Sequence, residues 1–321
     1  MGNRLAESAF EELVCVARPE SIEQLDAVGY RAANPDVERA GMDAREHYRL
    51  YGQAEGRIQW ANLEKIRHLR ERKVQALRFK RPPERERRYG ECPSFLSQET
   101  VQGFDLPEAP PVSANEYGES LLQSFRDNPH KLFLDVGAGL RYRYFSNVVS
   151  TEIYPSVSTD VLCVGEDLPF EDDQFDQVMA LAVLEHTKRP WQVAQEMCRV
   201  LKPGGTVLID YPFLQPVHGY PHHYFNATPQ GHRSLFEDRC DIQSVEIGLN
   251  QTPIYALHWM LQLWRGGLPA AEAERFDELR VKDLLARPPA EQAGEYYNRS
   301  LSKDVERLIA AGSTLLGTKK A

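Results

Sequence analysis

The sequence predicts an α/β fold built on a doubly wound parallel sheet. The first observation is a short apolar run that leads into Asp135 and a turn containing Gly137 and Gly139. A continuous apolar run of this kind is typical of a strand buried on both faces. The second observation is a strand candidate at 147–153 that carries an acid, Glu152, near its end. Ligands of doubly wound sheets bind beyond the carboxyl end of the first strand, so a site is expected at the glycine turn.

The first 81 residues are expected to form a small all-α module. Residues 1–17 look helical and acidic, and 21–58 form a compact unit with several helix start and stop signals. One such signal is Asn34-Pro35, where proline takes the first helical position. The string NPDVERAGMDAREHYRLYGQAEGR resembles a small helical module appended to bacterial glycosyltransferases and cell-surface enzymes. The resemblance implies docking to a partner or a glycan, and a packing role alone is the other interpretation.

The module is expected to end in a basic amphipathic helix over 59–81. Its apolar residues recur at helical spacing, and lysines and arginines occupy much of the rest. Such a helix can lie on an anionic membrane or bind a phosphorylated glycan, or it can be a solvated face beside a packed stripe. Residues 82–112 have the prolines of a linker, and a domain is expected over 113–321.

Helices and strands alternate along this domain. A helix is expected from Ser113 to about Arg126, another from Pro190, and a turn at 202–205 leads into the fifth strand. The remaining expected elements are a helix from Thr228-Pro229, a sixth strand at 240–247, an apolar helix at 253–264, a charged helical insertion at 270–311 and a final antiparallel strand at 313–318.

Composition limits the partners and the compartment. The net charge of −9 argues against general nucleic-acid binding. Five cysteines lie scattered without metal-ligand spacing, which indicates reduced thiols in the cytoplasm. The N-terminus has no signal-peptide pattern, and the longest apolar stretch, 254–264, is too short to cross a bilayer.

Five motifs follow one another between residues 135 and 205. They are DVGAG, an acid-tipped strand, EDLPF, FDQVMALAVLEH and RVLKPGG. In this order they resemble the class I S-adenosylmethionine-dependent methyltransferases, in the type 11-like branch with a very short first crossover that is often found among bacterial polysaccharide genes. The resemblance covers roughly 112–318. It implies a Rossmann-like, seven-stranded methyltransferase sheet with helices on both faces, and S-adenosylmethionine as the cofactor.

The resemblance implies which residues hold this cofactor. Gly137 and Gly139 approach it by their backbone, Asp135 fixes the loop and the methionine amine, and Glu152 accepts the ribose hydroxyls. Leu181 lies beside the methionine end. Two departures from the family pattern accompany these matches: Leu140-Arg141 replaces the third glycine, and Val164 stands where many relatives have an adenine-binding acid. The adenine contact is therefore expected from the Gly165 backbone or from Glu166, and Tyr117 is expected near the cofactor.

A loop after the fifth strand, 212–226, is expected to form the acceptor pocket. It contains three histidines and three aromatic residues. Histidine is the natural general base near neutral pH, and aromatic rings suit a sugar. His218 is the expected base, with His222 or His223 as the alternative. Because His222 and His223 are adjacent, their side chains should point in opposite directions in an extended segment.

The expected reaction is methylation of a hydroxyl on a sugar of a bacterial polysaccharide or glycolipid. The alternatives are methylation of a small metabolite or natural product, and a non-catalytic domain that keeps the fold. An NAD-dependent oxidoreductase is disfavoured because GxGxxG is missing. No metal is expected, because magnesium prefers carboxylates and water to the histidines of this loop. His186 is expected to face the cleft or to be structural.

Overall fold

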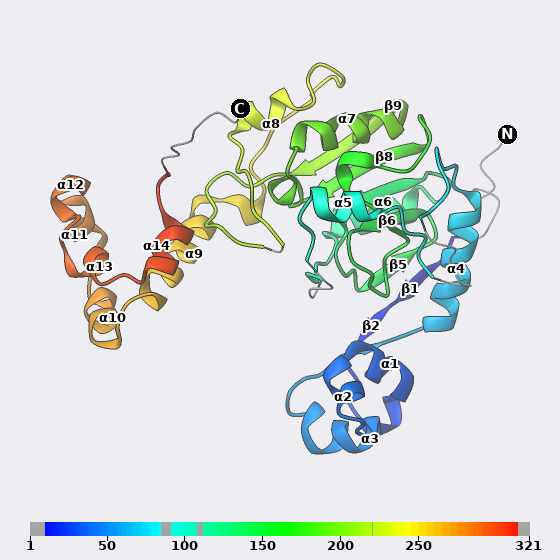
Figure 1. The fold of residues 1–321 in the computed structure, drawn as a ribbon, viewed down its shortest axis with the longest axis horizontal. Helices are drawn as coiled ribbons and strands as arrows, with labels where there is room; N and C mark the ends of the chain where they lie inside the picture. Colours follow the sequence, from blue (N-terminus) through cyan, green and yellow to red (C-terminus); the bar gives the residue numbers. More distant parts are fainter. Residues whose placement is uncertain (1–9, 85–90, 108–111, 220, 314–321) are drawn as a thin grey trace.

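Five parallel strands form the centre of the computed structural model, which describes residues 10–84, 91–107, 112–219 and 221–313. In the order in which they pair, the strands are β7 (Val161–Leu162), β6 (Val148–Glu152), β4 (Phe133–Val136), β8 (Phe175–Leu181) and β9 (Leu201–Asp210) (Figure 1). All neighbouring pairs are parallel, which confirms the predicted kind of sheet. The chain order reverses between β4 and β8, at the switch point where such sheets bind ligands.

Helices cover both faces of the sheet, as predicted. The two that pack most directly on it are α6 (Glu119–Asp127) and α7 (Pro190–Val200). Phe133 of β4 packs in one cluster with Phe125 of α6, whereas its neighbour Leu134 packs in another cluster with Met197 of α7. Since successive strand residues point to opposite faces, the two helices lie on opposite sides of the sheet.

The first crossover has no helix of its own. Between β4 and β6 the chain forms only a short strand, β5 (Arg143–Phe145), which pairs antiparallel with β1 (Glu12–Val14). The helix that packs here is α4 (Leu63–Ala76), which comes from the N-terminal part of the chain. Its residues Ile66 and Leu69 share a buried cluster with Tyr144 and Val157. An earlier segment thus covers what a longer crossover would cover.

The N-terminal module combines helices with short strands. Its elements are β2 (Val16–Ala17), α1 (Ala27–Ala33), α2 (Pro35–Arg39), α3 (Ala44–His47) and β3 (Gln59–Trp60), with single turns at Ile22–Gln24 and Tyr48–Gly52. Strand β2 pairs with β3, so the prediction of an all-α module is wrong for the described residues. The predicted helix over 1–17 is also wrong from residue 12 onward, because that backbone is hydrogen-bonded to β5 and β3. Residues 1–9 lie outside the described part.

The predicted basic helix is shorter than 59–81. Residues 59 and 60 belong to β3, and α4 ends at Ala76. Beyond it, Phe79 forms a bridge with Phe170, so this segment runs along the domain that follows. The expected linker contains α5 (Gln98–Gly103), and the N–H of Phe95 bonds to the carbonyl of Leu162 at 2.8 Å. The boundaries at residues 81 and 112 stay predictions.

The chain after β9 is largely helical. Its elements are α8 (Pro229–Ser234), a 3₁₀ turn at Leu249–Gln251, α9 (Pro253–Gly266), α10 (Ala270–Asp277), α11 (Val281–Leu285), α12 (Pro289–Gln292), α13 (Tyr296–Arg299) and α14 (Lys303–Ile309). Two more 3₁₀ turns, Gly165–Asp167 and Leu184–His186, lie before β9. Helices α10 to α14 extend away from the sheet (Figure 1). Together with α9 they form a small core around Trp264, Phe276 and Tyr297.

The predicted sixth strand at 240–247 is wrong, since this segment has no regular structure. Two of its apolar side chains, Val245 and Ile247, are 41% and 73% exposed, so they do not form the buried face of a strand. The expected last strand falls almost entirely on residues 314–318, outside the described part. The seven-stranded sheet is therefore not confirmed. Within the described residues, no helix is both long enough and apolar enough to cross a membrane.

Candidate functional site

The glycine turn follows β4 at the carboxyl edge of the sheet. Gly137 and Gly139 have φ angles of +66° and +67°, which other residues rarely adopt. A Cβ atom on Gly137 would lie 2.5 Å from a methyl group of Val183, and one on Gly139 would lie 2.5 Å from the carbonyl oxygen of Ser113. Both glycines are therefore required by close packing of the turn against its neighbours.

Glu152 ends β6 directly beside this turn. Its carboxylate accepts a hydrogen bond from the backbone N–H of Gly139 at 3.3 Å and another from the N–H of Ile153. Burial raises the pKa of Glu152 above its ordinary value, while these backbone donors act in the opposite direction. A carboxylate has about four acceptor positions, so it can take further donors such as ribose hydroxyls.

Asp135 lies below the turn and is completely buried. Its Oδ2 accepts hydrogen bonds from the Tyr117 hydroxyl at 2.7 Å and from Nε of Arg141 at 3.0 Å. Arg141, which replaces the third glycine of the family pattern, is 2% exposed and lies 4.3 Å from the Tyr117 ring centroid. Oδ1 of Asp135 has no hydrogen-bond partner among the described residues. Asp135 therefore holds the loop in place through Oδ2, and its Oδ1 is available to a ligand.

The residues expected near adenine and methionine lie on both sides of the switch point. Gly165 opens a single 3₁₀ turn and packs against Val193 of α7. Glu166 is 4% exposed, and its Oε1 accepts the N–H of Arg189 at the start of α7 at 3.3 Å, so its side chain anchors that helix. Leu181 is the last residue of β8 and packs against the cluster on the α6 face.

A second group of polar residues follows β8. Glu185 lies in the turn Leu184–His186, is 0% exposed, and has no hydrogen-bond partner for either carboxylate oxygen among the described residues. Burial raises the pKa of Glu185 to about 7, and the charge of Asp210 adds to this shift. A buried carboxylate without donors is costly, so Glu185 does not stabilise the fold by itself.

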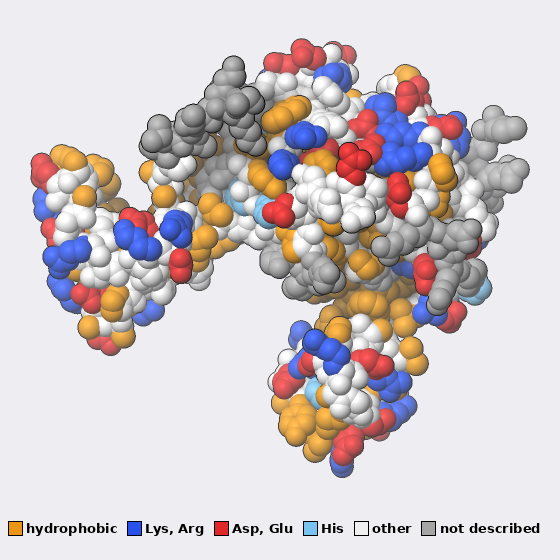
Figure 2. All heavy atoms as spheres, in the orientation of Figure 1, with side chains coloured by type: hydrophobic (Ala, Val, Ile, Leu, Met, Phe, Trp, Pro, Cys, Tyr) orange, Lys and Arg blue, Asp and Glu red, His pale blue; other side chains and the backbone are white. Residues whose placement is uncertain are grey.

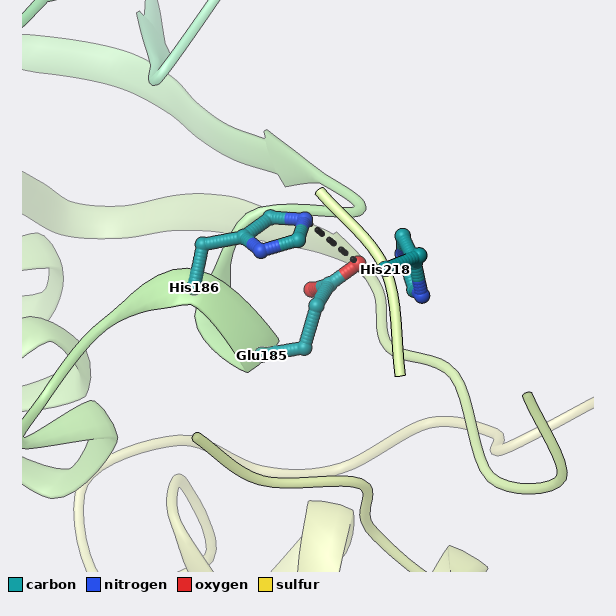
Figure 3. Close-up of side chains that lie close together, drawn as sticks. All are labelled: Glu185, His186 and His218. Atoms are coloured by element: carbon teal, nitrogen blue, oxygen red, sulfur yellow. Dashed lines mark ion pairs between the residues drawn. The ribbon is translucent and has the colours of Figure 1, made fainter. Parts of the chain in front are cut away.

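His186 faces this carboxylate. Its Nε2 lies 3.7 Å from Oε1 of Glu185 (Figure 3). Its Nδ1 lies 2.7 Å from the carbonyl oxygen of His222. Gly219, with a φ of +81°, packs on the ring so closely that a Cβ atom there would come within 2.0 Å of Cε1. The loop after β9 thus packs closely against the His186 ring.

The loop histidines divide into two groups. The ring centroids of His218 and His223 are 4.4 Å apart and lie 5.2 Å and 5.6 Å from that of His186. His222 instead directs Nε2 to the carbonyl oxygen of Asp105 at 2.9 Å. The predicted divergence of His222 and His223 is confirmed. Figure 2 shows histidine surface where the central body meets the C-terminal helices, and the side chains of His218, His222 and His223 are half-buried.

Glu185 was not among the residues predicted from the sequence. Its signal was the Leu184-Glu185-His186 run at the end of a buried strand, which alone cannot show whether the acid points inward. A separate hollow lined by Lys131, Asp176, Lys202 and Gly204 lies at the opposite end of β4 and β8. It belongs to neither group of predicted residues.

Comparisons with known proteins point to one class of domain. Residues 134–209 match the family model described as a methyltransferase domain. An uncharacterised methyltransferase of Mycobacterium leprae is 33% identical over 109 residues, which cover 28% of this chain and 40% of that protein. An uncharacterised methyltransferase of Mycobacterium tuberculosis is 47% identical over 57 residues, which cover 17% and 22%. The chain thus spans less than half the length of these relatives.

Solved structures give weaker similarities. The YcgJ protein of Bacillus subtilis has a TM-score of 0.29 and 17% identity, covering 45% of this chain and 80% of that one. Phosphoethanolamine N-methyltransferase 2 of Haemonchus contortus, solved with S-adenosyl-L-methionine, has a TM-score of 0.30 and 20% identity, covering 55% and 46%. The family match thus places similarity to a methyltransferase domain at 134–209, which includes most of the parallel sheet.

Proposed function

We propose that this protein transfers a methyl group from S-adenosylmethionine to a hydroxyl group of an acceptor. The observation that carries the proposal is the arrangement at one edge of the sheet. The glycine turn and Glu152 follow β4 and β6, and the group of Glu185, His186 and His218 follows β8 and β9. A donor site and an acceptor site then lie on either side of the switch point between β4 and β8.

The donor site consists of the turn and the acids around it. S-adenosylmethionine supplies an activated methyl group on a sulfonium, whose sulfur keeps the bonding electron pair when the methyl leaves. Glu152 binds the ribose hydroxyls, the Gly137 and Gly139 backbone lies along the cofactor, and Asp135 offers its unpartnered Oδ1 to the methionine amine. Gly165, Glu166 and Leu181 line the adenine and methionine ends.

The acceptor hydroxyl has to lose its proton as its oxygen attacks the methyl carbon. His218 is proposed to take this proton, with His222 and His223 as alternatives. The Nδ1 of His218 lies 2.8 Å from the carbonyl oxygen of Pro216 and must therefore carry the hydrogen, which leaves Nε2 as the accepting nitrogen. Burial lowers the pKa of His218 and so keeps its imidazole neutral at pH 7.

A sugar of a bacterial polysaccharide or glycolipid is the acceptor that we propose. The loop after β9 brings Tyr224 and Phe225 beside Glu185, with the Tyr224 N–H bonded to its carbonyl at 2.7 Å. Aromatic rings at a polar site suit the mixed faces of a sugar ring. A cytoplasmic location and a contact of the N-terminal module with a membrane or a glycosyltransferase stay predictions. Lys73 and Arg70 of the basic helix are buried, so such a contact would use its other basic residues.

The donor assignment is tested by Glu152→Ala. The change removes an acceptor of two charge-assisted hydrogen bonds, so S-adenosylmethionine affinity should fall by about 2–3 kcal/mol. Calorimetry with the cofactor measures this directly. Unchanged affinity would remove Glu152 from the donor site.

The acceptor assignment is tested by His218→Ala, with His222→Ala as the matched control. We expect His218→Ala to lower turnover by about a hundredfold or more while cofactor affinity barely changes. His222→Ala should keep most of its activity, because that ring faces Asp105. Because burial lowers the pKa of His218 and the imidazole has to be neutral to accept the proton, the parent's rate should fall only at pH values below the ordinary histidine pKa. Full activity in His218→Ala would transfer the role to His223 or His222.

A further inference from the structure

Three side chains of the acceptor group offer ligand atoms close together. A carboxylate oxygen of Glu185 and a ring nitrogen of each of His186 and His218 lie within 4.8 Å of one another. Figure 3 shows the carboxylate and the His186 ring turned toward each other, with His218 approaching from the loop after β9. The group therefore joins two elements that are distant in sequence.

The hydrogen bonds of the two imidazoles determine which nitrogens are available. Nδ1 of His186 faces the carbonyl oxygen of His222, and Nδ1 of His218 faces that of Pro216. A carbonyl only accepts, so both Nδ1 atoms carry the hydrogen and both Nε2 atoms have a lone pair. Metal-bound histidines typically show this arrangement, with the second ring nitrogen held by a backbone carbonyl.

His223 supports the group without joining it. Its Nδ1 accepts the backbone N–H of His218 at 3.1 Å, and its Nε2 lies 2.9 Å from Oδ1 of Asn226. Both ring nitrogens are thus occupied, and the contact orients the backbone of His218. Asn226 is held in turn by the carbonyl of Gln215 at 3.0 Å.

Within the described part of the chain, Nε2 of His186 and the Glu185 carboxylate lack a hydrogen-bond donor or a cation between them. Nε2 of His186 and Oε1 of Glu185 are both acceptors, yet they face each other at 3.7 Å. The Glu185 carboxylate is completely buried and has no donor among the described residues. A proton or a cation between these atoms would remove the repulsion of their lone pairs.

We propose that Glu185, His186 and His218 bind a divalent transition-metal ion, with Zn²⁺ as the best match. Two imidazoles and one carboxylate suit Zn²⁺ and its first-row neighbours better than Mg²⁺. Three protein ligands leave one tetrahedral position open, as in catalytic rather than structural zinc sites. Tetrahedral bonds of about 2.0–2.1 Å place ligand atoms about 3.3 Å apart, so the His218 ring moves inward when the ion binds.

The ion changes the role of His218 given above. In the loaded protein its Nε2 binds the metal, and the open position takes the acceptor oxygen. The ion lowers the pKa of that hydroxyl, whose proton passes to water. This role of the ion rests on the proposed methyl transfer, whereas binding of the ion does not.

The test uses the full chain after treatment with a chelator. Titration with Co²⁺, followed by its visible absorption, should show one bound ion per chain, and Zn²⁺ should displace it. Zn²⁺ should also raise the unfolding temperature, because it binds the folded state. Glu185→Gln and His218→Ala should weaken Co²⁺ binding by at least about a hundredfold, because even the loss of a group that only hydrogen-bonds a metal ligand costs about 10–100-fold.

Two control variants keep the result specific. His222→Ala removes the neighbouring ring that faces Asp105 and should leave Co²⁺ binding unchanged. The double variant Cys198→Ser with Cys240→Ser removes a thiol pair whose sulfurs lie 3.6 Å apart, and binding should again be unchanged. Equal loss in either control, or no Co²⁺ absorption in the parent, would overturn the metal site.

Measurements of S-adenosylmethionine binding and methyl transfer distinguish a failure of the metal proposal from a failure of the proposed methyltransferase function. If the protein binds S-adenosylmethionine and methylates an acceptor in excess chelator, the role of the ion in the reaction is overturned and the methyltransferase stands. If it binds one Co²⁺ through Glu185 and His218 but does not bind the cofactor, the proposed function fails and the metal site stands.

Discussion

Two buried carboxylates of this protein have opposite surroundings. Asp160, just before β7, and Glu185, just after β8, are each 0% exposed. Asp160 accepts hydrogen bonds from the Lys73 ammonium at 2.6 Å, from the Tyr144 hydroxyl and from the Ser150 N–H at 2.9 Å. Glu185 accepts none from the described residues.

This difference indicates that the charge of Asp160 is structural, whereas the charge of Glu185 is available to a ligand. Lys73 also donates to the carbonyls of Phe145 and Val148, so all three of its protons are used. Burial lowers the pKa of Lys73 to about 8, while Asp160 favours its charged form. This group holds α4 against β6 and needs nothing further. Glu185 destabilises the fold unless a cation or a proton joins it.

The largest expected effect comes from Lys73→Met. The change leaves the Asp160 charge buried without its main partner, which costs about 3–5 kcal/mol. Lys65→Met is the matched control, because Lys65 is exposed on the same helix and should change stability by less than about 0.5 kcal/mol. Denaturant unfolding of both variants measures the difference. Equal stability would show that α4 does not depend on this pair.

A smaller effect is expected from Tyr144→Phe. It removes one hydrogen bond to a charged oxygen of Asp160 and keeps the ring, so unfolding should become easier by about 1.5–3 kcal/mol. Tyr142→Phe makes the same change two residues earlier, at a half-buried side chain, and should be close to neutral. Equal free energies of unfolding for the two variants would show that the hydrogen bond from Tyr144 to Asp160 does not stabilise the fold.

The smallest effect on stability is expected from Glu185→Gln in metal-free protein. The change keeps the shape and removes an unpaired charge, so stability should fall by less than about 1 kcal/mol or rise. Asp160→Asn, the same change at the satisfied site, should cost several times more because it leaves Lys73 unpaired. Chemical denaturation near pH 8 compares the two. A large loss in Glu185→Gln would mean that the carboxylate already has a partner in the folded protein.

Local sequence patterns predicted the central strands of the sheet better than the strands outside its centre. The apolar runs of β4, β6 and β8 are buried on both faces, so each strand is recognisable from its own residues. The segment 240–247 also carries apolar residues, and Cys240 and Ile242 pack against the core, but its backbone pairs with none of the described strands. Strands β1 and β2 form because β5 and β3 offer backbone partners that are more than 40 residues away.

The sequence by itself determined the class of domain, the glycine turn, the acid at the end of β6 and the histidine-rich loop. These features depend on neighbouring residues and on the alternation of strand and helix. Only the tertiary structure decided that α4 covers the short crossover through Lys73, and that Glu185 points inward toward His186 and His218. Both depend on contacts between distant segments, and a charged side chain in a sequence does not show whether its partners surround it or are absent.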